Sequence, residues 1–304
     1  MTLFLMVWWN KALGGSTEGW FQHYADLVWQ GRVPYLDFYL FTPPGHLLET
    51  LALSKFFGLD YMVFRWFGLI QRLLMCVILF VWLVRYFHPF FSFLGATLCM
   101  LAYSCDGPDV LFYVNHSTAL WSLLACWMAS HLDTRSKAWF AWVIAAGFFA
   151  GINCLVKQTT GLGISMLIPV AWLIMGWRSP WQARLKLALP CYGLAWGIPI
   201  LGALLWMNSQ GAWHAFIEQV FVRGTSSKGP LVDTLFRPFS PFPTAVLYGV
   251  LVYLFWRLSG FYLKKYKKWE VTPTQSLSPR FQLVGGVVSG GMSFGGVLVG
   301  LASP

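Results

Sequence analysis

The sequence predicts an all-α membrane protein, a polytopic bundle of about eight or nine transmembrane helices. Three observations lead to this class. Hydrophobic residues make up 57% of the 304 residues and charged residues only 11%, whereas about a quarter of a soluble domain is charged. Apolar runs long enough to cross a hydrocarbon core of about 30 Å recur along the chain. The longest segments between them are rich in Trp and Tyr, which are enriched at membrane surfaces.

Seven runs have the length and composition of a transmembrane helix. They cover roughly residues 62–86, 89–105, 117–132, 138–156, 160–177, 187–207 and 242–260. Two runs at the ends are less typical: residues 2–14 are short, so we interpret them as a clipped first span, and residues 283–301 are rich in glycine. Residues 1–304 are therefore predicted to form a single transmembrane domain, with the first outer loop at 15–61 and the remaining spans and short loops at 62–304.

The basic residues predict which loops face the cytoplasm. When Arg85, the turn at 135–137 and the basic stretches at 178–186 and 264–268 share one side, the loops alternate correctly across every good span. Counted together with Arg257 and Arg280, that side then holds 12 of the 21 basic residues but only two of the eleven carboxylates. We therefore expect a multi-pass protein of the cell inner membrane with a cytoplasmic N-terminus. Its net charge of +10 favours anionic lipid headgroups over nucleic acid as a partner.

The first outer loop is predicted to carry juxtamembrane helices. Ser16 or Thr17 can cap a helix whose first turn contains Glu18, and Gly31 ends it. The apolar face of this helix is predicted to comprise Trp20, Tyr24, Leu27 and Val28. The prolines that follow exclude a helix up to Pro44, and a second short helix follows over residues 46–58.

An ordered set of residues in this loop carries a family resemblance. The set is Glu18, Ala25, Gly31, Tyr35, Asp37 and Pro43-Pro44-Gly45. It resembles the pattern of the polytopic glycosyltransferases in the protein O-mannosyltransferase and aminoarabinose-transferase group, which have the C-type glycosyltransferase fold. Thr17 stands where that family usually has Asp. Residues 145–163 are similar to the family segment in which a span ends in a Lys-Gln pair at the outer surface, and the resemblance covers roughly residues 5–180.

The resemblance implies a membrane enzyme that transfers a sugar from a polyprenyl-phosphate donor to an acceptor hydroxyl, with inversion at the anomeric carbon. Transfer would occur on the extracytoplasmic face. The implied partners are the lipid-linked sugar, membrane lipid and an acceptor protein, lipid or glycan. Such a reaction needs a carboxylate to accept the acceptor's proton and cations to hold the leaving phosphate.

Two carboxylates are candidates for the base. Glu18 is the first, because it matches the acidic motif and begins an interfacial helix beside aromatic residues; the alternative is an acid that stabilises the helix N-terminus. Asp37 is the second, and the alternative is a loop carboxylate that holds the backbone of a Pro-rich turn.

Four cations are candidates for binding the donor phosphate. Lys157 is the strongest, because it ends a span on the outer side, where an ammonium in hydrocarbon would be expensive; the alternative is snorkelling to the headgroups. Arg223 and Lys228 lie in a Gly/Ser-rich outer loop that can close over a phosphate or remain solvated. Arg32 lies between the two candidate carboxylates and can pair with either of them or with the donor.

Four further residues are candidates for substrate contact. Tyr35 and Gln158 belong to the matching motifs, and Asn115 and His116 lie at an outer turn where family members also place polar groups. A turn capped by Asn and Ser explains the last two nearly as well. We expect no cofactor. A divalent metal is a lesser alternative, since His23 with Asp26 and His46 with Glu49 are spaced i, i+3 as metal ligands can be.

Two other functions compete with this interpretation. A transporter or lipid-handling protein usually carries ionisable groups near the midplane of broken spans, whereas the charges here gather at the surface. An inactive fragment of a glycosyltransferase fits the clipped first span, Thr17 in place of Asp, and the short C-terminal end.

Overall fold

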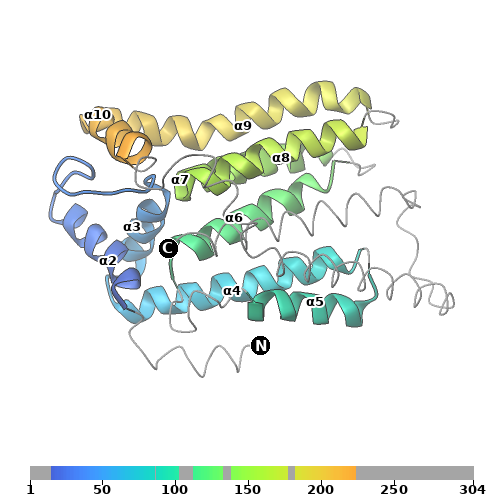
Figure 1. Ribbon diagram of the computed structural model, residues 1–304, viewed down its shortest axis with the longest axis horizontal. Coiled ribbons are helices and arrows are strands. Elements are labelled where there is room, and N and C mark those ends of the chain that lie inside the picture. The colour runs from blue at the N-terminus through green and yellow to red at the C-terminus, as the bar shows by residue number, and fades with distance from the viewer. Residues whose placement is uncertain (1–14, 86, 103–111, 133–137, 177–181, 224–304) are drawn as a thin grey trace.

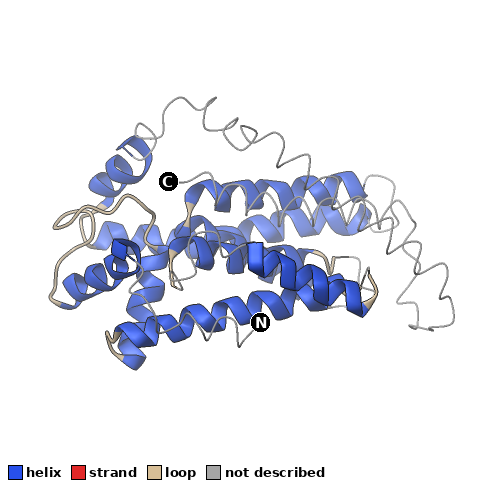
Figure 2. Ribbon diagram, turned by 60° about the horizontal axis from the view of Figure 1, so that its bottom comes forward, coloured by secondary structure: helices blue, strands red, loops and turns tan. Residues whose placement is uncertain are grey.

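The computed structural model describes residues 15–85, 87–102, 112–132, 138–176 and 182–223. Over these ranges the chain forms helices joined by loops, and the only β-type pairing among them is an isolated bridge between Pro34 and Phe38 (Figure 2). The helices are α2 (Gly15–Trp29), α3 (Gly45–Phe57), α4 (Tyr61–Leu83), α5 (Pro89–Ala102), α6 (Val114–Ala129), α7 (Trp139–Val156), α8 (Gln158–Gly176), α9 (Gln182–Ser209), α10 (Trp213–Ile217) and the π-helical η2 (Glu218–Arg223).

The long helices lie side by side in an elongated bundle, and the short helices cover one of its ends (Figure 1). Helices α4 to α9 run along the bundle, whereas α2, α3 and α10 gather at the end where α6 begins and α7 stops. The predicted all-α polytopic class is confirmed. Six predicted spans correspond to α4 to α9, and the segments 2–14, 242–260 and 283–301 lie outside the described residues.

The spans differ in how well they match a membrane-crossing helix. Three are long and apolar enough to cross by length and composition: α4, α7 and residues 184–209 of α9. Helices α5 and α8 contain shorter apolar stretches, Pro89–Cys99 and Gln158–Ile174. Helix α6 carries four consecutive buried polar residues, from Asn115 to Thr118, in its first two turns. This polar start of α6 lies at the end of the bundle that the short helices cover.

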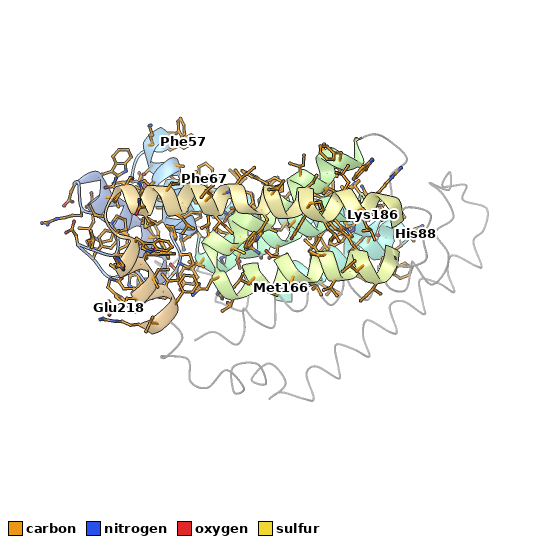
Figure 3. All side chains as sticks on the ribbon, turned by 90° about the horizontal axis from the view of Figure 1, so that it is seen from above. Phe57, Phe67, His88, Met166, Lys186 and Glu218 are labelled. Atoms are coloured by element: carbon orange, nitrogen blue, oxygen red, sulfur yellow. The ribbon has the colours of Figure 1, made fainter. Side chains whose placement is uncertain are left out.

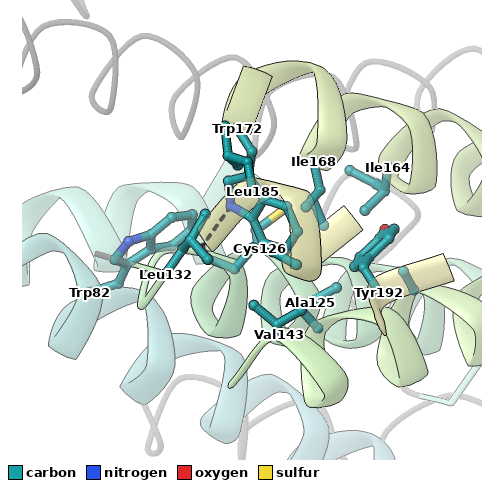
Figure 4. Close-up of a cluster of buried hydrophobic side chains, with 14 residues drawn as sticks. Trp82, Ala125, Cys126, Leu132, Val143, Ile164, Ile168, Trp172, Leu185 and Tyr192 are labelled. Carbon is teal, nitrogen blue, oxygen red and sulfur yellow. Dashed lines mark hydrogen bonds between the residues drawn. The ribbon is translucent and has the colours of Figure 1, made fainter. Parts of the chain in front are cut away.

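Helix α7 forms the centre of the bundle and packs against α6, α8 and α9. Gly147 and Gly151 allow this, because a Cβ atom at either position would collide with a carbonyl oxygen of α9, at Tyr192 or Trp196. Small residues four apart let two membrane helices approach closely. The core around this contact is apolar, as Figure 4 shows, and the indole N–H of Trp172 donates a hydrogen bond of 3.1 Å to the carbonyl oxygen of Ala129.

A second apolar cluster joins α2, the first loop and α3 to the end of the bundle. It contains Phe21, Ala25, Tyr35, Leu40, Leu47, Val114, Val156, Met207, Ala212, Phe216 and Val220. The buried face of α2 therefore differs from the predicted one. Phe21 and Ala25 are buried, whereas Trp20 remains 40% exposed, because the helix packs on protein instead of lying flat with its Trp and Tyr residues toward lipid.

Candidate active site at the covered end of the bundle

The loop between α2 and α3 is held at both of its ends. Helix α2 ends in a Schellman motif, in which Gly31 has φ of 85° and Arg32 N–H bonds to the carbonyl oxygen of Leu27. At the other end Gly45 lies so close to the last turn of α7 that a Cβ atom there would collide with the backbone of Leu155. The glycine of the Pro-Pro-Gly motif is thus required by packing. It holds the start of α3 against Leu155, which lies two positions before Lys157 in the chain.

Tyr35 stabilises the shape of this loop. Its side chain is 2% exposed, and its hydroxyl donates a 2.9 Å hydrogen bond to the carbonyl oxygen of Thr42. Burial raises the pKa of the Tyr35 phenol well above its ordinary value, so the hydroxyl stays a donor. Its φ of 68° is unusual for a residue other than glycine. The described contacts place Tyr35 in a supporting position inside the loop.

A glutamine from the far end of the described chain also clamps the loop. The side chain of Gln219 in η2 accepts a hydrogen bond of 3.0 Å from the backbone N–H of Leu40 and donates one of 2.7 Å to the carbonyl oxygen of Tyr35. The ring of Phe216 meets the ring of Tyr35 edge-on at 5.2 Å. The first loop and the segment after α9 are therefore packed against each other.

Lys157 and Asn115 come together in the structure, although 42 positions separate them. Lys157 interrupts the helical hairpin between α7 and α8 with an extended backbone conformation, and its side chain is only 9% exposed. Its Nζ donates a hydrogen bond of 2.8 Å to Asn115 Oδ1 in the first turn of α6. The Asn115 amide thus fixes the position of the ammonium.

A line of buried polar side chains beneath Lys157 fixes α7 against α6. The carbonyl oxygen of Asn153 accepts from the backbone N–H of Lys157 at 2.9 Å. The Asn153 side chain accepts from Thr118 and donates a 2.8 Å hydrogen bond to Ser122. Because every one of these side chains is buried, each unsatisfied partner would cost about 1–3 kcal/mol, so the network defines the register of the two helices.

Arg72 and His116 form a second buried pair. Arg72 lies in α4 with 4% of its surface exposed, and its Nη2 is 2.8 Å from Nε2 of the fully buried His116. Because the guanidinium can only donate, His116 accepts through Nε2 and carries its proton on Nδ1. Arg72 is not among the site residues predicted from the sequence. An arginine inside an apolar run is itself a signal, because such a residue is expensive in hydrocarbon and usually functional.

His46 and Glu49 lie on α3 beside these residues. His46 Nδ1 is 3.0 Å from Glu49 Oε2 and 3.2 Å from the hydroxyl of Ser117 in α6. Glu49 also accepts a hydrogen bond from the indole N–H of Trp121. The predicted i, i+3 pairing on one helix face is therefore present as a hydrogen-bonded pair. Within the described ranges no group of three or more His, Cys, Asp and Glu side chains is placed to hold a metal ion, so this pair and that of His23 with Asp26 do not meet.

The other candidates occupy less central places. Asp37 is exposed, and its Oδ2 accepts a 2.6 Å hydrogen bond from the backbone N–H of Val33, as a carboxylate that holds a turn does. Arg223 is exposed and pairs with Glu218 at 2.6 Å. Arg32 is exposed on the loop, and Gln158, the first residue of α8, is half-buried. Glu18 lies in the first turn of α2, where only its backbone is described, and Lys228 lies outside the described residues.

The two ends of the bundle carry different residues. Glu218 lies at the end covered by the loop, and Figure 3 shows Lys186 and His88 at the other. At that other end Arg85 bonds to His131, and Arg184 lies 5.5 Å from the centre of the Trp139 ring and donates to the carbonyl oxygen of Leu132. The residues predicted to face opposite sides of the membrane thus lie at opposite ends of the helices.

Comparison with known proteins identifies the fold. No protein-family profile and no curated protein matches the sequence. The structure, however, matches the crystal structure of ArnT from Cupriavidus metallidurans in the apo state, with a TM-score of 0.56 and 18% sequence identity over 99% of this chain. The chain has the ArnT fold. It spans 58% of the length of that ArnT chain. The fold expected from the resemblance of the first loop is therefore confirmed, and the protein is a multi-pass membrane protein.

Proposed function

We propose that this protein is a membrane glycosyltransferase that moves a sugar from a polyprenyl-phosphate donor to an acceptor hydroxyl, with inversion and on the extracytoplasmic face of the inner membrane. The ArnT fold and the ordered residues of the first loop support this reaction class. One observation carries the proposal further: Lys157 and Arg72 are buried cations at the end of the bundle where the loop docks. A lipid-linked phosphate would lie at this depth, where its head leaves the hydrocarbon.

The cations would act on the leaving group. As the acceptor oxygen attacks the anomeric carbon, the bond from that carbon to the phosphate oxygen breaks, and the phosphate leaves with the electron pair. A fixed ammonium or guanidinium stabilises this developing charge more effectively than mobile water does, because it needs no reorganisation. Lys157 is well suited to this role because the Asn115 amide holds its Nζ in one place. Arg72 can contribute a second positive charge.

A carboxylate of the first loop would accept the proton of the acceptor hydroxyl. Glu18 is the proposed base because it matches the acidic residue of the family pattern. Helical spacing puts position 18 of α2 on the same stripe as positions 21 and 25, and Phe21 and Ala25 form the buried stripe. Asp37 is the second choice, since its exposed carboxylate already accepts the Val33 N–H.

The experiment is a transfer assay with purified protein in lipid nanodiscs, using polyprenyl phosphates that carry a hexose or an aminopentose. Glu18→Gln is expected to abolish transfer while leaving membrane insertion and donor binding intact. If Glu18→Gln transfers normally and Asp37→Asn does not, the base is Asp37 and the reaction class stands. Normal transfer by both variants would overturn the proposed chemistry. Failure of the wild-type protein to bind or use any of these donors would favour a lipid-handling protein or an inactive fragment.

A further inference from the structure

His46 is held in a fixed orientation inside the covered end of the bundle. It lies in the first turn of α3 and none of its surface is exposed. The ring of Phe21 meets the imidazole edge-on with centroids 4.5 Å apart, and the ring of Phe112 lies on another side at 4.7 Å. Two phenyl rings and a polar edge are the composition of a small-molecule site, which is mostly apolar with few, well-placed polar groups.

Glu49 determines which nitrogen of His46 carries the proton. Its carboxylate faces Nδ1 at 3.0 Å and is itself fixed by the indole N–H of Trp121 on its other oxygen. A carboxylate can only accept, so Nδ1 donates. The other nitrogen, Nε2, then presents a lone pair. This is the arrangement by which carboxylates orient imidazoles in catalytic and metal sites.

The lone pair of His46 Nε2 accepts no hydrogen bond from the described residues. This atom is buried and has no hydrogen-bond partner in the described part of the chain. The same holds for Oε1 of Gln71 in α4, whose Nε2 donates 3.1 Å to Ser117, the residue that also contacts His46. His46 and Gln71, each with one unsatisfied buried acceptor, therefore contact the same Ser117 hydroxyl through a nitrogen atom of each side chain. Leaving such an atom unsatisfied costs about 1–3 kcal/mol, and unsatisfied groups in native proteins usually have a functional reason.

The chemistry of the missing partner follows from the two acceptors. Both atoms need a hydrogen-bond donor, and an ionised phosphate offers only acceptors. A hydroxyl group offers a donor, and the C–H edges of a sugar ring suit the neighbouring Phe21 and Phe112 rings. The cations of the site, Lys157 and Arg72, match the phosphate of a lipid-linked donor, whereas His46 and Gln71 match its sugar.

We propose that His46, oriented by Glu49, is the specificity-determining residue that accepts a hydrogen bond from a hydroxyl of the transferred sugar, with Gln71 as a second acceptor. This inference rests on the proposed function. Phe21 or Phe112 must change rotamer to admit the sugar, as side chains in binding sites commonly do. A site that bonds a hydroxyl discriminates strongly against ligands without one, because its own buried acceptor is then left unpaired.

The test compares binding of two probes: undecaprenyl phosphate alone, and undecaprenyl phosphate carrying glucose, mannose or aminoarabinose. His46→Phe keeps the ring shape and removes the acceptor. It is expected to weaken binding of the preferred sugar-bearing probe by about 10- to 100-fold, because a buried sugar hydroxyl loses its hydrogen-bond acceptor, and to leave binding of undecaprenyl phosphate unchanged.

A second variant keeps the imidazole in place. In Glu49→Gln the amide oxygen remains fixed by Trp121, so its NH2 group faces Nδ1 of His46. The ring proton then moves to Nε2, which becomes a donor. Glu49→Gln is therefore expected to show the same selective loss as His46→Phe without a loss of side-chain volume. Thr50→Val is the matched control, because Thr50 is buried one turn further along α3 and donates only to the carbonyl oxygen of His46.

The outcomes separate the two proposals. If both variants bind the sugar-bearing probe as tightly as the wild type, or lose both probes equally, this inference is wrong. If the wild-type protein binds neither probe, the proposed function fails. Thermal unfolding in detergent identifies a variant that is misfolded, and Glu49→Gln alone then decides the question.

Discussion

Helix α7 has two different environments along its length. In its middle, Gly147 and Gly151 contact the backbone of α9, and the neighbouring core is apolar. At its end, Asn153 and Lys157 bond to polar side chains of α6. The middle is thus specified by shape, because van der Waals packing holds membrane helices together. The end is specified by hydrogen bonds, because buried polar groups must be paired. Substitutions in the two regions should therefore fail in different ways.

The largest effect is expected at the polar end. Lys157→Met removes the ammonium while keeping a side chain of similar length, and transfer should fall by roughly 100-fold or more, as when one electrostatic stabiliser is lost from an active site. The folded protein should persist. Sugar-transfer kinetics and thermal unfolding check both parts. Lys55→Met, an exposed lysine on α3, is the control, and an equal loss in both variants would argue against a specific role for Lys157.

The next effect is expected in the apolar middle. Gly147→Ala introduces a methyl group against the carbonyl oxygen of Tyr192, and overpacking of this kind costs typically about 1–3 kcal/mol. The same change at Gly193 meets nothing within 4 Å. Thermal unfolding in detergent should show a lower Tm for Gly147→Ala only. Equal Tm values for the two variants would mean that α7 and α9 can move apart without a loss of stability.

A smaller effect is expected where the loop meets η2. Gln219→Ala removes both hydrogen bonds to the loop, and about 1 kcal/mol for each is a typical net value. Amide hydrogen exchange at Leu40 should become faster, while exchange in α7 stays unchanged. Gln210→Ala, at an exposed position after α9, provides the comparison. Unchanged exchange at Leu40 would show that apolar packing alone holds the loop.

The smallest effect is expected at the surface. Arg223 and Glu218 form an ion pair whose side chains are 61% and 54% exposed, and such pairs contribute about 0–1 kcal/mol. Arg223→Ala should therefore leave Tm nearly unchanged. The same variant tests the phosphate contact that the sequence predicts for Arg223, because a donor contact would give a higher KM at constant Tm. A clear drop in Tm would contradict the description of this pair as a solvated contact.

The sequence was sufficient for the fold class and for most helix boundaries. Apolar runs long enough to span a membrane predict α4 to α9 because the bilayer sets helix length, a constraint that is local in sequence. Gly31 and the prolines after it predict the end of α2 for the same local reason. The buried face of α2 was not predictable in this way, because Trp20 and Phe21 are both apolar and only the packing partner selects between them.

The candidate site also has a part that the sequence predicts and a part that depends on the packing of the helices. The sequence alone predicted Lys157 and Asn115 as candidates for substrate binding and His46 with Glu49 as candidate metal ligands, because charged or polar residues beside apolar runs and an i, i+3 spacing are visible in the sequence. Only the tertiary structure paired Arg72 with His116 and Lys157 with Asn115, and only it showed that the buried Tyr35 hydroxyl bonds to the carbonyl oxygen of Thr42. Hydrogen bonds between positions more than 40 residues apart depend on how the helices pack, and the sequence pattern of each helix does not contain that information.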